Sequence, residues 1–356
     1  MGWLTGWNYR KSHIINAATG AGTNYQKQIT VHYGAGSDSD DDVYLNGKCK
    51  TDFGDIRFTD NDETTLLDYW LESKVDSDNA IFWVEVADSL ESAAQTIYIY
   101  YGNAGVSTTS SGADTFLFFD DFTSDTLNPA WTFVQSGQGG DSYSLTNSPD
   151  KLRIVGSKQD SHQQLTMMIR DADAGDYVLE VLMTGTWDAN YKNSGLVVGD
   201  GVGPAAGNRI VAQLMHETSA SPHTIVWQEK RVAIVRTAIY PNTRFTEPSF
   251  PADVLMQFIK LGTNFYTALR IAGVWYNGAS LQAYTSTATK NGIVCNNDDA
   301  TNTFTCDFDD FRVRKYVSPE PGDGAWGSEE TPPTTGKLLV HPGYNGGYRK
   351  HRGGYR

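Results

Sequence analysis

The sequence predicts an all-β fold: two tandem antiparallel β-sandwich domains of jelly-roll-like form, followed by a flexible basic tail. The first observation is that short segments of alternating apolar and polar residues follow one another over most of the chain. The second is a Gly-, Ser- and Thr-rich stretch between the strand-like segments IYIYY and FLFFDDF. The third is the near absence of helical periodicity, since only LLDYWLES, residues 66–73, resembles a helical turn.

Composition supports this fold class and excludes others. The 356 residues suffice for two or three domains, and 35 Gly, 19 Tyr and 9 Trp are typical of a turn-rich, aromatic-rich β-protein. With 28 Lys and Arg against 42 Asp and Glu, the net charge of −14 argues against nucleic acid as a partner. No apolar run approaches the roughly 18 residues of a membrane span, so we expect none.

The composition changes along the chain define the expected domains. Alternating segments occupy two long regions, and Pro, Gly and Glu dominate a stretch after the second of them. We therefore expect a first sandwich at residues 1–103, a linker at 104–115, a second sandwich at 116–316, a linker at 317–336 and a basic Gly/Tyr-rich tail at 337–356.

Five blocks in the first region follow one another in a recognisable order. They are Trp7 with Tyr9 and Arg10, then GDIRF at 54–58, LLDYW at 66–70, WVEV at 83–86 and YYGN at 100–103. In order and spacing, residues 3–116 resemble the family catalogued as domain of unknown function 2341. That resemblance implies a small β-sandwich of secreted or surface proteins of bacteria and archaea, with no assigned chemistry.

The second region begins and ends with similar motifs. It opens with FDDF at 119–122, close to Trp131, and closes with Asp309, Asp310 and Phe311 in a strand-like segment. This pairing, with short alternating segments between, is similar to the concanavalin A-like lectin/glucanase sandwiches, including the laminin-G-like ones. The likeness is one of pattern and implies an antiparallel sandwich.

The sequence shows no catalytic motif, which predicts that the protein is not an enzyme. Retaining glycosidases of the concanavalin-like fold commonly carry two carboxylates on one strand as Glu-x-Asp-x-x-Glu, whereas Glu180 and Glu229 stand alone here. The seven histidines are dispersed, with no pair at metal-ligand spacing.

Two segments carry the residue types that bind sugars. Flat aromatic faces stack on the apolar side of a pyranose, and amides and carboxylates bind its hydroxyls. The candidates lie in TWDANYKNSG and VWYNG: Trp187, Asp188, Asn190 and Tyr191, and Trp275, Tyr276 and Asn277. The alternative is that both tryptophans belong to the core or to turns.

Paired acids and two cysteines suggest further sites. If the first and last strands of the second sandwich lie side by side, Asp120, Asp121, Asp309 and Asp310 can hold a structural calcium; solvated edge acids are the alternative. No other cofactor is expected. Cys295 and Cys306 flank a predicted hairpin, NNDDATNTFT, and form a disulfide if they face each other across paired strands; otherwise they are free thiols.

These observations favour a non-catalytic recognition or adhesion protein that binds a glycan or cell-surface polymer. The family resemblance suggests the outside of a prokaryotic cell. No signal peptide is visible in MGWLTGWNYRK, so the signal has been removed or the protein leaves the cell by lysis, as on a virus particle. The alternatives are a structural subunit of a filament or virus particle and a glycoside hydrolase-like enzyme.

The basic tail suggests an attachment point. Residues 337–356 carry five Lys or Arg and no acid, which leaves 23 bases against 42 acids, or −19, for the rest of the chain. We expect this tail to anchor the protein to an assembly, with the Pro-rich linker as a spacer; a solvated, disordered tail is the alternative.

Overall fold

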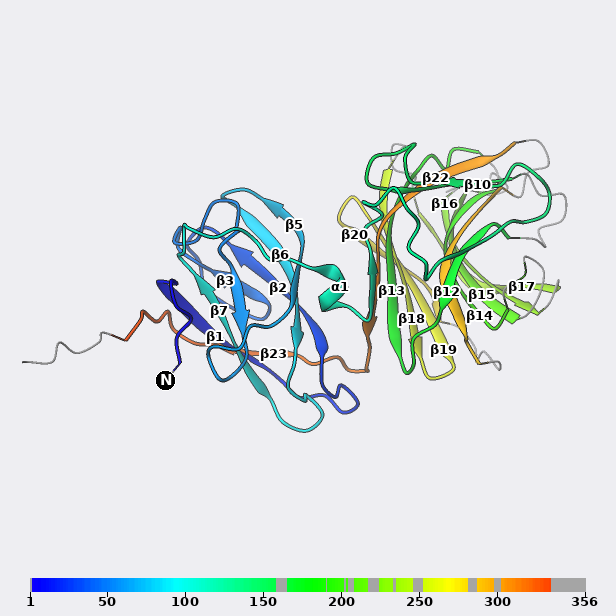
Figure 1. The fold of residues 1–356 in the computed structure, drawn as a ribbon. Coiled ribbons are helices and arrows are strands. Elements are labelled where there is room, and N and C mark those ends of the chain that lie inside the picture. The colour runs from blue at the N-terminus through cyan, green and yellow to red at the C-terminus, as the bar shows by residue number, and fades with distance from the viewer. Residues whose placement is uncertain are drawn as a thin grey trace, which may run out of the picture.

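The computed structural model contains two β-sandwiches (Figure 1), which confirms the predicted all-β fold class. It describes residues 2–157, 165–189, 191–201, 203, 208–216, 224–232, 235–245, 252–280, 287–297 and 302–333; for 216, 224–232, 235–245 and 278–280 it describes the backbone alone. In these residues the α-helical part is one short element, α1 (Gly112–Thr115). No helix among them is long and apolar enough to cross a membrane.

The first sandwich consists of two four-stranded sheets. Alternate residues of each strand point inward, such as Ile29, Phe82 and Ile99, all of which are buried. All pairings are antiparallel except that of β2 with β3. One sheet has the order β23 (Asp323–Trp326), β1 (Tyr9–Ile15), β7 (Gln95–Tyr101), β4 (Arg57–Thr59); the other has β3 (Asp42–Tyr44), β2 (Tyr25–His32), β6 (Asn79–Val86), β5 (Tyr69–Val75).

The last strand of this first sandwich comes from the far end of the chain. Strand β23 pairs with β1, so the segment after the second sandwich returns to the first (Figure 1). Asp323 accepts a hydrogen bond from Lys27 Nζ at 2.9 Å, and its carboxylate lies 3.0 Å from His13 Nε2. The second sandwich is therefore inserted into the first.

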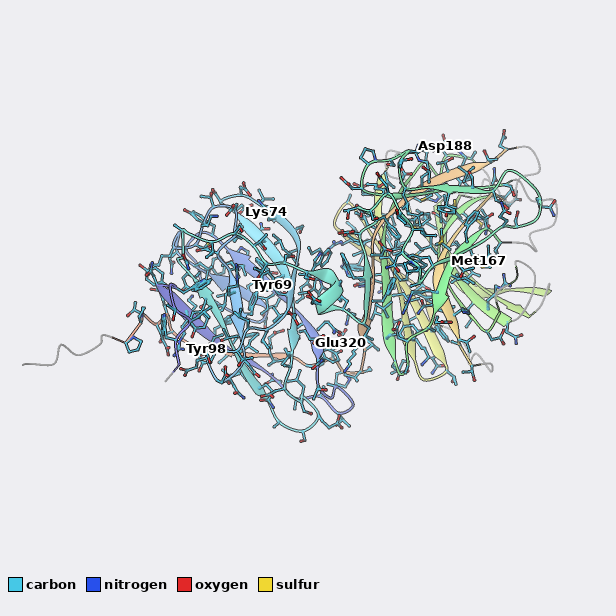
Figure 2. All side chains as sticks on the ribbon, viewed as in Figure 1. Tyr69, Lys74, Tyr98, Met167, Asp188 and Glu320 are labelled. Carbon is cyan, nitrogen blue, oxygen red and sulfur yellow. The ribbon has the colours of Figure 1, made fainter. Side chains whose placement is uncertain are left out.

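The prediction that residues 317–336 form a spacer is thus wrong for the described part of that segment. Arg314 donates to Glu320 at 2.6 Å, and Tyr25 Oη donates to the same carboxylate at 2.9 Å. Figure 2 shows Glu320 where the two sandwiches meet. Beyond Pro333 the predicted tail, residues 337–356, lies outside the described residues.

The second sandwich also consists of two sheets. Its core contains buried aromatic and aliphatic side chains from both of them, among them Phe258, Leu196 and Ile293. One sheet has the order β10 (Ser142–Ser144), β11 (Leu152–Gly156), β22 (Phe304–Lys315), β13 (Tyr177–Gly185), β18 (Ala252–Leu261), β19 (Asn264–Ile271), β20 (Val274–Ser280), with β8 (Phe118–Asp120) also paired to β22. The other has β17 (Val235–Phe245), β16 (Thr224–Val232), β15 (Asn208–His216), β14 (Lys192–Gly199), β21 (Lys290–Asn297), β12 (Met167–Asp171), β9 (Thr132–Val134).

Strand β22 contains a bulge at its Asp-Asp pair. Phe308 and Phe311 are both buried in the core although they are three residues apart, which strict alternation does not allow. The register against β13 shifts there, and Asp310 has a φ of 47°. The extra residue of the bulge lets both phenylalanines face inward and leaves Asp309 and Asp310 half-buried.

An aromatic cluster and a buried arginine join the two sandwiches. Trp70 and Trp83 of the first sandwich pack with Phe116, and Phe119 of β8 contacts Trp70 with ring centroids 5.0 Å apart. The Arg312 guanidinium lies 5.1 Å from the Trp70 ring centroid. It also pairs with Glu180 of its own sandwich at 2.7 Å and with Glu72 of the other at 3.1 Å.

The segment between the sandwiches packs against the first of them. Tyr69 Oη accepts a hydrogen bond from Thr109 N at 3.0 Å, and the Tyr69 carbonyl accepts one from Ser111 N at 2.9 Å. Helix α1 follows, capped by the Ser111 hydroxyl, and Gln26 donates to the Thr115 carbonyl at 3.0 Å. Residues 107–115, predicted as part of a linker, therefore form the wall that faces the second sandwich (Figure 1).

Candidate functional site

A pocket of about 550 Å³ lies where this wall meets the opening strand of the second sandwich. Both sandwiches contribute: Trp70 comes from β5, residues 110–113 from the wall, and Phe119 and Asp120 from β8. Its lining residues are Trp70, Ser110, Ser111, Gly112, Ala113, Phe119, Asp120, Asp121 and Asn128. We call it the interdomain pocket.

Local hydrogen bonds fix the wall of the interdomain pocket. Ser110 Oγ accepts from Leu71 N at 2.8 Å, which ties the wall to strand β5. Ser111 Oγ accepts from Asp114 N at 3.3 Å, as expected of a serine before the first turn of a helix. Gly112 is required because a Cβ at this position would lie 2.4 Å from the Phe119 ring. The small wall residues thus let Phe119 approach closely.

Asp120 and Asp121 supply carboxylates to the pocket. Asp120 accepts from Trp131 Nε1 at 2.8 Å and from Phe122 N at 2.9 Å, while burial raises its pKa against the effect of these hydrogen bonds. Asp121 accepts from the Thr123 hydroxyl at 2.8 Å. Asp120 is therefore held in one orientation, and Asp121 keeps one carboxylate oxygen outside these turn contacts.

Asp309 and Asp310 lie next to the pocket on the bulge of β22. Burial, followed by the negative charge of Asp309, raises the pKa of Asp310 to about 7, and the charge of Asp121 acts in the same direction. Burial also raises the pKa of Asp309. The structure therefore brings the four predicted acids to one region, with at least one carboxyl group near its protonation point at neutral pH.

The four acids do not form the ligand set that the calcium prediction requires. Within the described ranges, no group of three or more His, Cys, Asp or Glu side chains is arranged to hold a metal ion. Two of the four carboxylates are engaged elsewhere, because Asp120 accepts from Trp131 Nε1 and Asp309 accepts from Asp310 N. Converging oxygen atoms, which calcium requires, are not formed by the four acids.

The described residues of the predicted sugar-binding segment at 187–191 are divided between the core and the surface. Trp187 is 0% exposed, and its Nε1 donates to Ser194 Oγ at 3.1 Å, so the core alternative is correct for this residue. Asp188, at the top of the second sandwich in Figure 2, pairs with Lys192 at 2.6 Å. Tyr191 is exposed, with a φ of 65°, and Asn190 lies outside the described residues.

The second predicted segment is divided between two faces of β20. Trp275 is 45% exposed, and the Arg270 guanidinium lies 5.6 Å from its ring centroid. Tyr276 instead packs against the core, because neighbouring residues of a strand point to opposite faces. Asn277 is exposed, on the same face as Trp275. Two of the three predicted residues therefore remain accessible to a ligand.

Cys295 and Cys306 are free and buried, so the disulfide prediction is wrong. They do not face each other across paired strands, because β21 and β22 belong to different sheets of the second sandwich. Cys295 Sγ donates to the Ile154 carbonyl, and Cys306 Sγ donates to that of Thr184. Burial raises the pKa of the Cys306 thiol to about 12, which makes both unreactive structural residues.

Sequence reasoning missed the pocket residues of the first sandwich and the wall. Trp70 was visible only as part of a family block, and Ser110 and Ser111 only as linker residues. Asn128 precedes Trp131 and was not among the predicted site residues. One usable signal was the FDDF motif itself, since two acids between phenylalanines must place polar groups beside an aromatic cluster.

The interdomain pocket combines the groups that recognise a polar ring compound. Trp70, which is 8% exposed, and Phe119, which is half-buried, line the pocket with aromatic edges. Asp120 and Asp121 provide acceptors, and Ser110, Ser111 and Asn128 provide hydroxyl and amide groups. Such a mixture binds a molecule with one apolar face and several hydroxyls. The fold and this site define a protein of two interlocked β-sandwiches with a polar, aromatic-edged pocket between them.

Comparison with known proteins gives one family match. Residues 52–134 match the family described as Domain of unknown function (DUF2341), which confirms the resemblance expected of the first sandwich and extends through the wall to β9. No curated protein matches the chain.

Several solved structures are similar at low identity. The GH43 BlXynB protein from Bacillus licheniformis aligns with a TM-score of 0.46 and 16% identity over 70% of this chain and 46% of its own. A xylan beta-1,4-xylosidase from Bacillus halodurans gives 0.45 and 14% over 62% and 47%. The tandem CBM22 domains of Xyn10C from Paenibacillus barcinonensis give 0.27 and 9% over 88% and 80%.

These likenesses concern the fold alone, and this chain spans about half the length of the two Bacillus proteins. The comparison contradicts the prediction that the protein is not an enzyme, because the similar structures include a xylan beta-1,4-xylosidase and a GH43 glycoside hydrolase. The missing Glu-x-Asp-x-x-Glu strand excludes one arrangement of carboxylates only. Carboxyl groups from separate segments can also lie near each other, and the charge of Asp121 contributes to the raised pKa of Asp310 here, after burial and Asp309.

Proposed function

We propose that the protein recognises a glycan, and that the interdomain pocket is its binding site. The observation that carries this proposal is the meeting of Trp70, Phe119, Asp121 and Asn128 around one cavity of about 550 Å³. Pyranose rings match such a site because one face of the ring is apolar while its hydroxyls donate to carboxylates and accept from amides. The partner is a glycan or cell-surface polymer, outside the cell or on a virus particle.

The structure of the junction supports recognition by a preorganised site. The ion pairs of Arg312 with Glu180 and Glu72 fix the orientation of the two sandwiches relative to each other. The contacts of the returning segment at Glu320 do the same. A pocket between two bodies keeps its shape only if the bodies do not rotate, and less conformational entropy is then lost on binding.

A glycan array followed by isothermal titration tests the proposal. Asp121→Asn removes the negative acceptor but retains an oxygen for the Thr123 hydrogen bond, so the turn is preserved. A hydrogen bond to a charged group contributes about 1.5–3 kcal/mol, so we expect the Kd to rise about ten-fold or more. The matched control is Asp125→Asn, an exposed acid that is not part of the pocket lining.

Two results would contradict the proposal. Equal affinities of wild type, Asp121→Asn and Asp125→Asn would place the binding site elsewhere. The absence of binding to any arrayed glycan would reject glycan recognition, and ordered self-assembly of the same sample would then favour a structural subunit.

Hydrolysis of the bound glycan is a second candidate function, favoured by Asp310. A carboxyl group with a pKa of about 7 keeps its proton near neutral pH, as a general acid must, and Asp121 and Asp309 lie close enough to influence it. The test is release of reducing sugar from array hits by wild type and by Asp310→Asn. Release by wild type but not by the variant supports hydrolysis, and no release by either rejects it.

A further inference from the structure

The outer face of the β22-containing sheet carries a row of side chains that begins beside the interdomain pocket. Inward residues of this sheet include Met183, Met256 and Leu269, all in the core of the second sandwich. Their strand neighbours must point to the opposite face, because side chains alternate along a strand. Directly opposed residues of antiparallel strands share a face, so the register defines which outer residues are neighbours.

The register places five outer residues side by side across five strands. The pairs are Asp309 with Leu182, Leu182 with Leu255, Leu255 with Arg270, and Arg270 with Trp275. Four strand spacings separate the two ends, or about 19 Å. We call these five residues the transverse row.

The chemistry of the transverse row changes along its length. Asp309 lies at the pocket end, where burial raises its pKa and the charge of Asp121 acts in the same direction, against that of Lys151. Leu182 is half-buried and Leu255 is 7% exposed, so the middle of the row is apolar and mostly covered. Trp275 at the far end is 45% exposed, and the Arg270 guanidinium lies against one side of its ring.

We infer that the transverse row is a second part of the glycan site, which binds a linear oligosaccharide that extends from the interdomain pocket to Trp275. The inference rests on the proposed function. A disaccharide is too short to bridge about 19 Å, whereas a hexasaccharide lies across the sheet and stacks one ring on Trp275.

The negative charges of this surface favour a neutral polymer over an acidic one. Asp120, Asp121 and Asp309 gather at the pocket end, and the whole chain carries a net charge of −14. A polymer of uronic acids would meet like charges there, which costs affinity. The single cation of the row, Arg270, lies at the opposite end against Trp275.

Affinity as a function of glycan length tests the inference. A neutral disaccharide and hexasaccharide of one linkage, chosen from the glycan array hits, are titrated into wild type, Trp275→Ala and Tyr143→Ala. Tyr143 is the control because it is an exposed aromatic residue, 40% accessible, on β10 at the other end of the same sheet. Both replacements are at exposed side chains, and melting curves check that the fold is unchanged.

We expect wild type and Tyr143→Ala to bind the hexasaccharide more tightly than the disaccharide. Trp275→Ala should lose about five- to ten-fold in hexasaccharide affinity and leave disaccharide affinity unchanged. If Trp275→Ala binds both sugars as wild type does, while Asp121→Asn weakens both, the inference fails and the proposed function stands. If wild type binds neither sugar, both fail. Tighter binding of a hexauronate than of the neutral hexasaccharide would overturn the choice of a neutral polymer.

Discussion

Replacement of Arg312 by methionine should destabilise the protein more than any surface charge replacement. The Arg312 side chain is 2% exposed and pairs with Glu180, which is 1% exposed, and with Glu72. Methionine keeps much of the apolar stem against Trp70 but leaves the buried carboxylate of Glu180 without its main partner. Removal of one member of a buried ion pair costs about 3–5 kcal/mol.

A surface pair gives the scale for comparison. Arg153 pairs with Asp307 at 2.7 Å, but its side chain is 33% exposed, so Arg153→Met should cost only about 0–1 kcal/mol. The double variant Arg312→Met with Glu180→Gln removes the buried charge and should recover part of the loss. Urea unfolding followed by tryptophan fluorescence measures all three, because Trp70 and Trp83 lie at the junction.

The loss caused by Arg312→Met should also depend on pH. In the wild type, burial opposes ionisation of Glu180, but Arg312 and Arg314 outweigh it and lower its pKa. Without Arg312 the buried carboxyl group binds a proton more readily, so the destabilisation should become smaller as the pH falls toward 4. A loss below 1 kcal/mol at pH 7, or one no larger than that of Arg153→Met, would refute the reasoning.

Three further predictions follow from the returning segment, the bulge and the thiols. Truncation after Tyr316 should lower the melting temperature strongly, because it removes β23 and the Glu320 contacts. Truncation after Pro333 should leave the melting temperature unchanged. Equal melting curves of the two variants would show that the first sandwich is complete without the segment. Asp310 has a folded-state pKa raised to about 7, above the 3.8 of the unfolded chain, so its folded-state proton stabilises the protein at low pH. This contribution to the free energy of unfolding should decline as the pH rises from about 4 to 7. Urea titrations across this range measure the decline, and Asp310→Asn should abolish it. Native protein should give no reaction with a thiol reagent, and unfolded protein without reductant should give three thiols per chain; one thiol would indicate a disulfide.

The sequence was sufficient for the fold class because alternation is local. Inward residues such as Ile29, Phe82 and Ile99 recur at every second position, so each strand shows its buried face without knowledge of its neighbours. The calcium hypothesis assumed that the first and last strands of the second sandwich lie side by side, as in the lectin-like sandwiches that the chain resembles, and β8 does pair with β22.

The returning segment could not be predicted in this way. Its Pro, Gly and Glu residues have the composition of a linker, and β23 has only four residues. Long-range hydrogen bonds place it on the first sandwich, such as those of Lys27 with Asp323 and of Tyr25 with Glu320. The two residues of each pair are more than 290 residues apart in the sequence. No local pattern encodes such pairs.

The candidate site was predicted in part for a related reason. Asp120 and Asp121 were recognised because their phenylalanine neighbours fix which way they point, whereas Trp187 was misplaced because a loop-like sequence does not reveal burial. The interdomain pocket depends on the contact between two sandwiches, and its wall residues carry no periodic signal.

The central claim is that a glycan binds between the sandwiches, and hydrogen exchange with and without a glycan from the array tests it most directly. A bound glycan should slow exchange of the amides at residues 110–121 and at Asn128, around the interdomain pocket. Slower exchange confined to residues 186–199, with no change at residues 110–121, would contradict it.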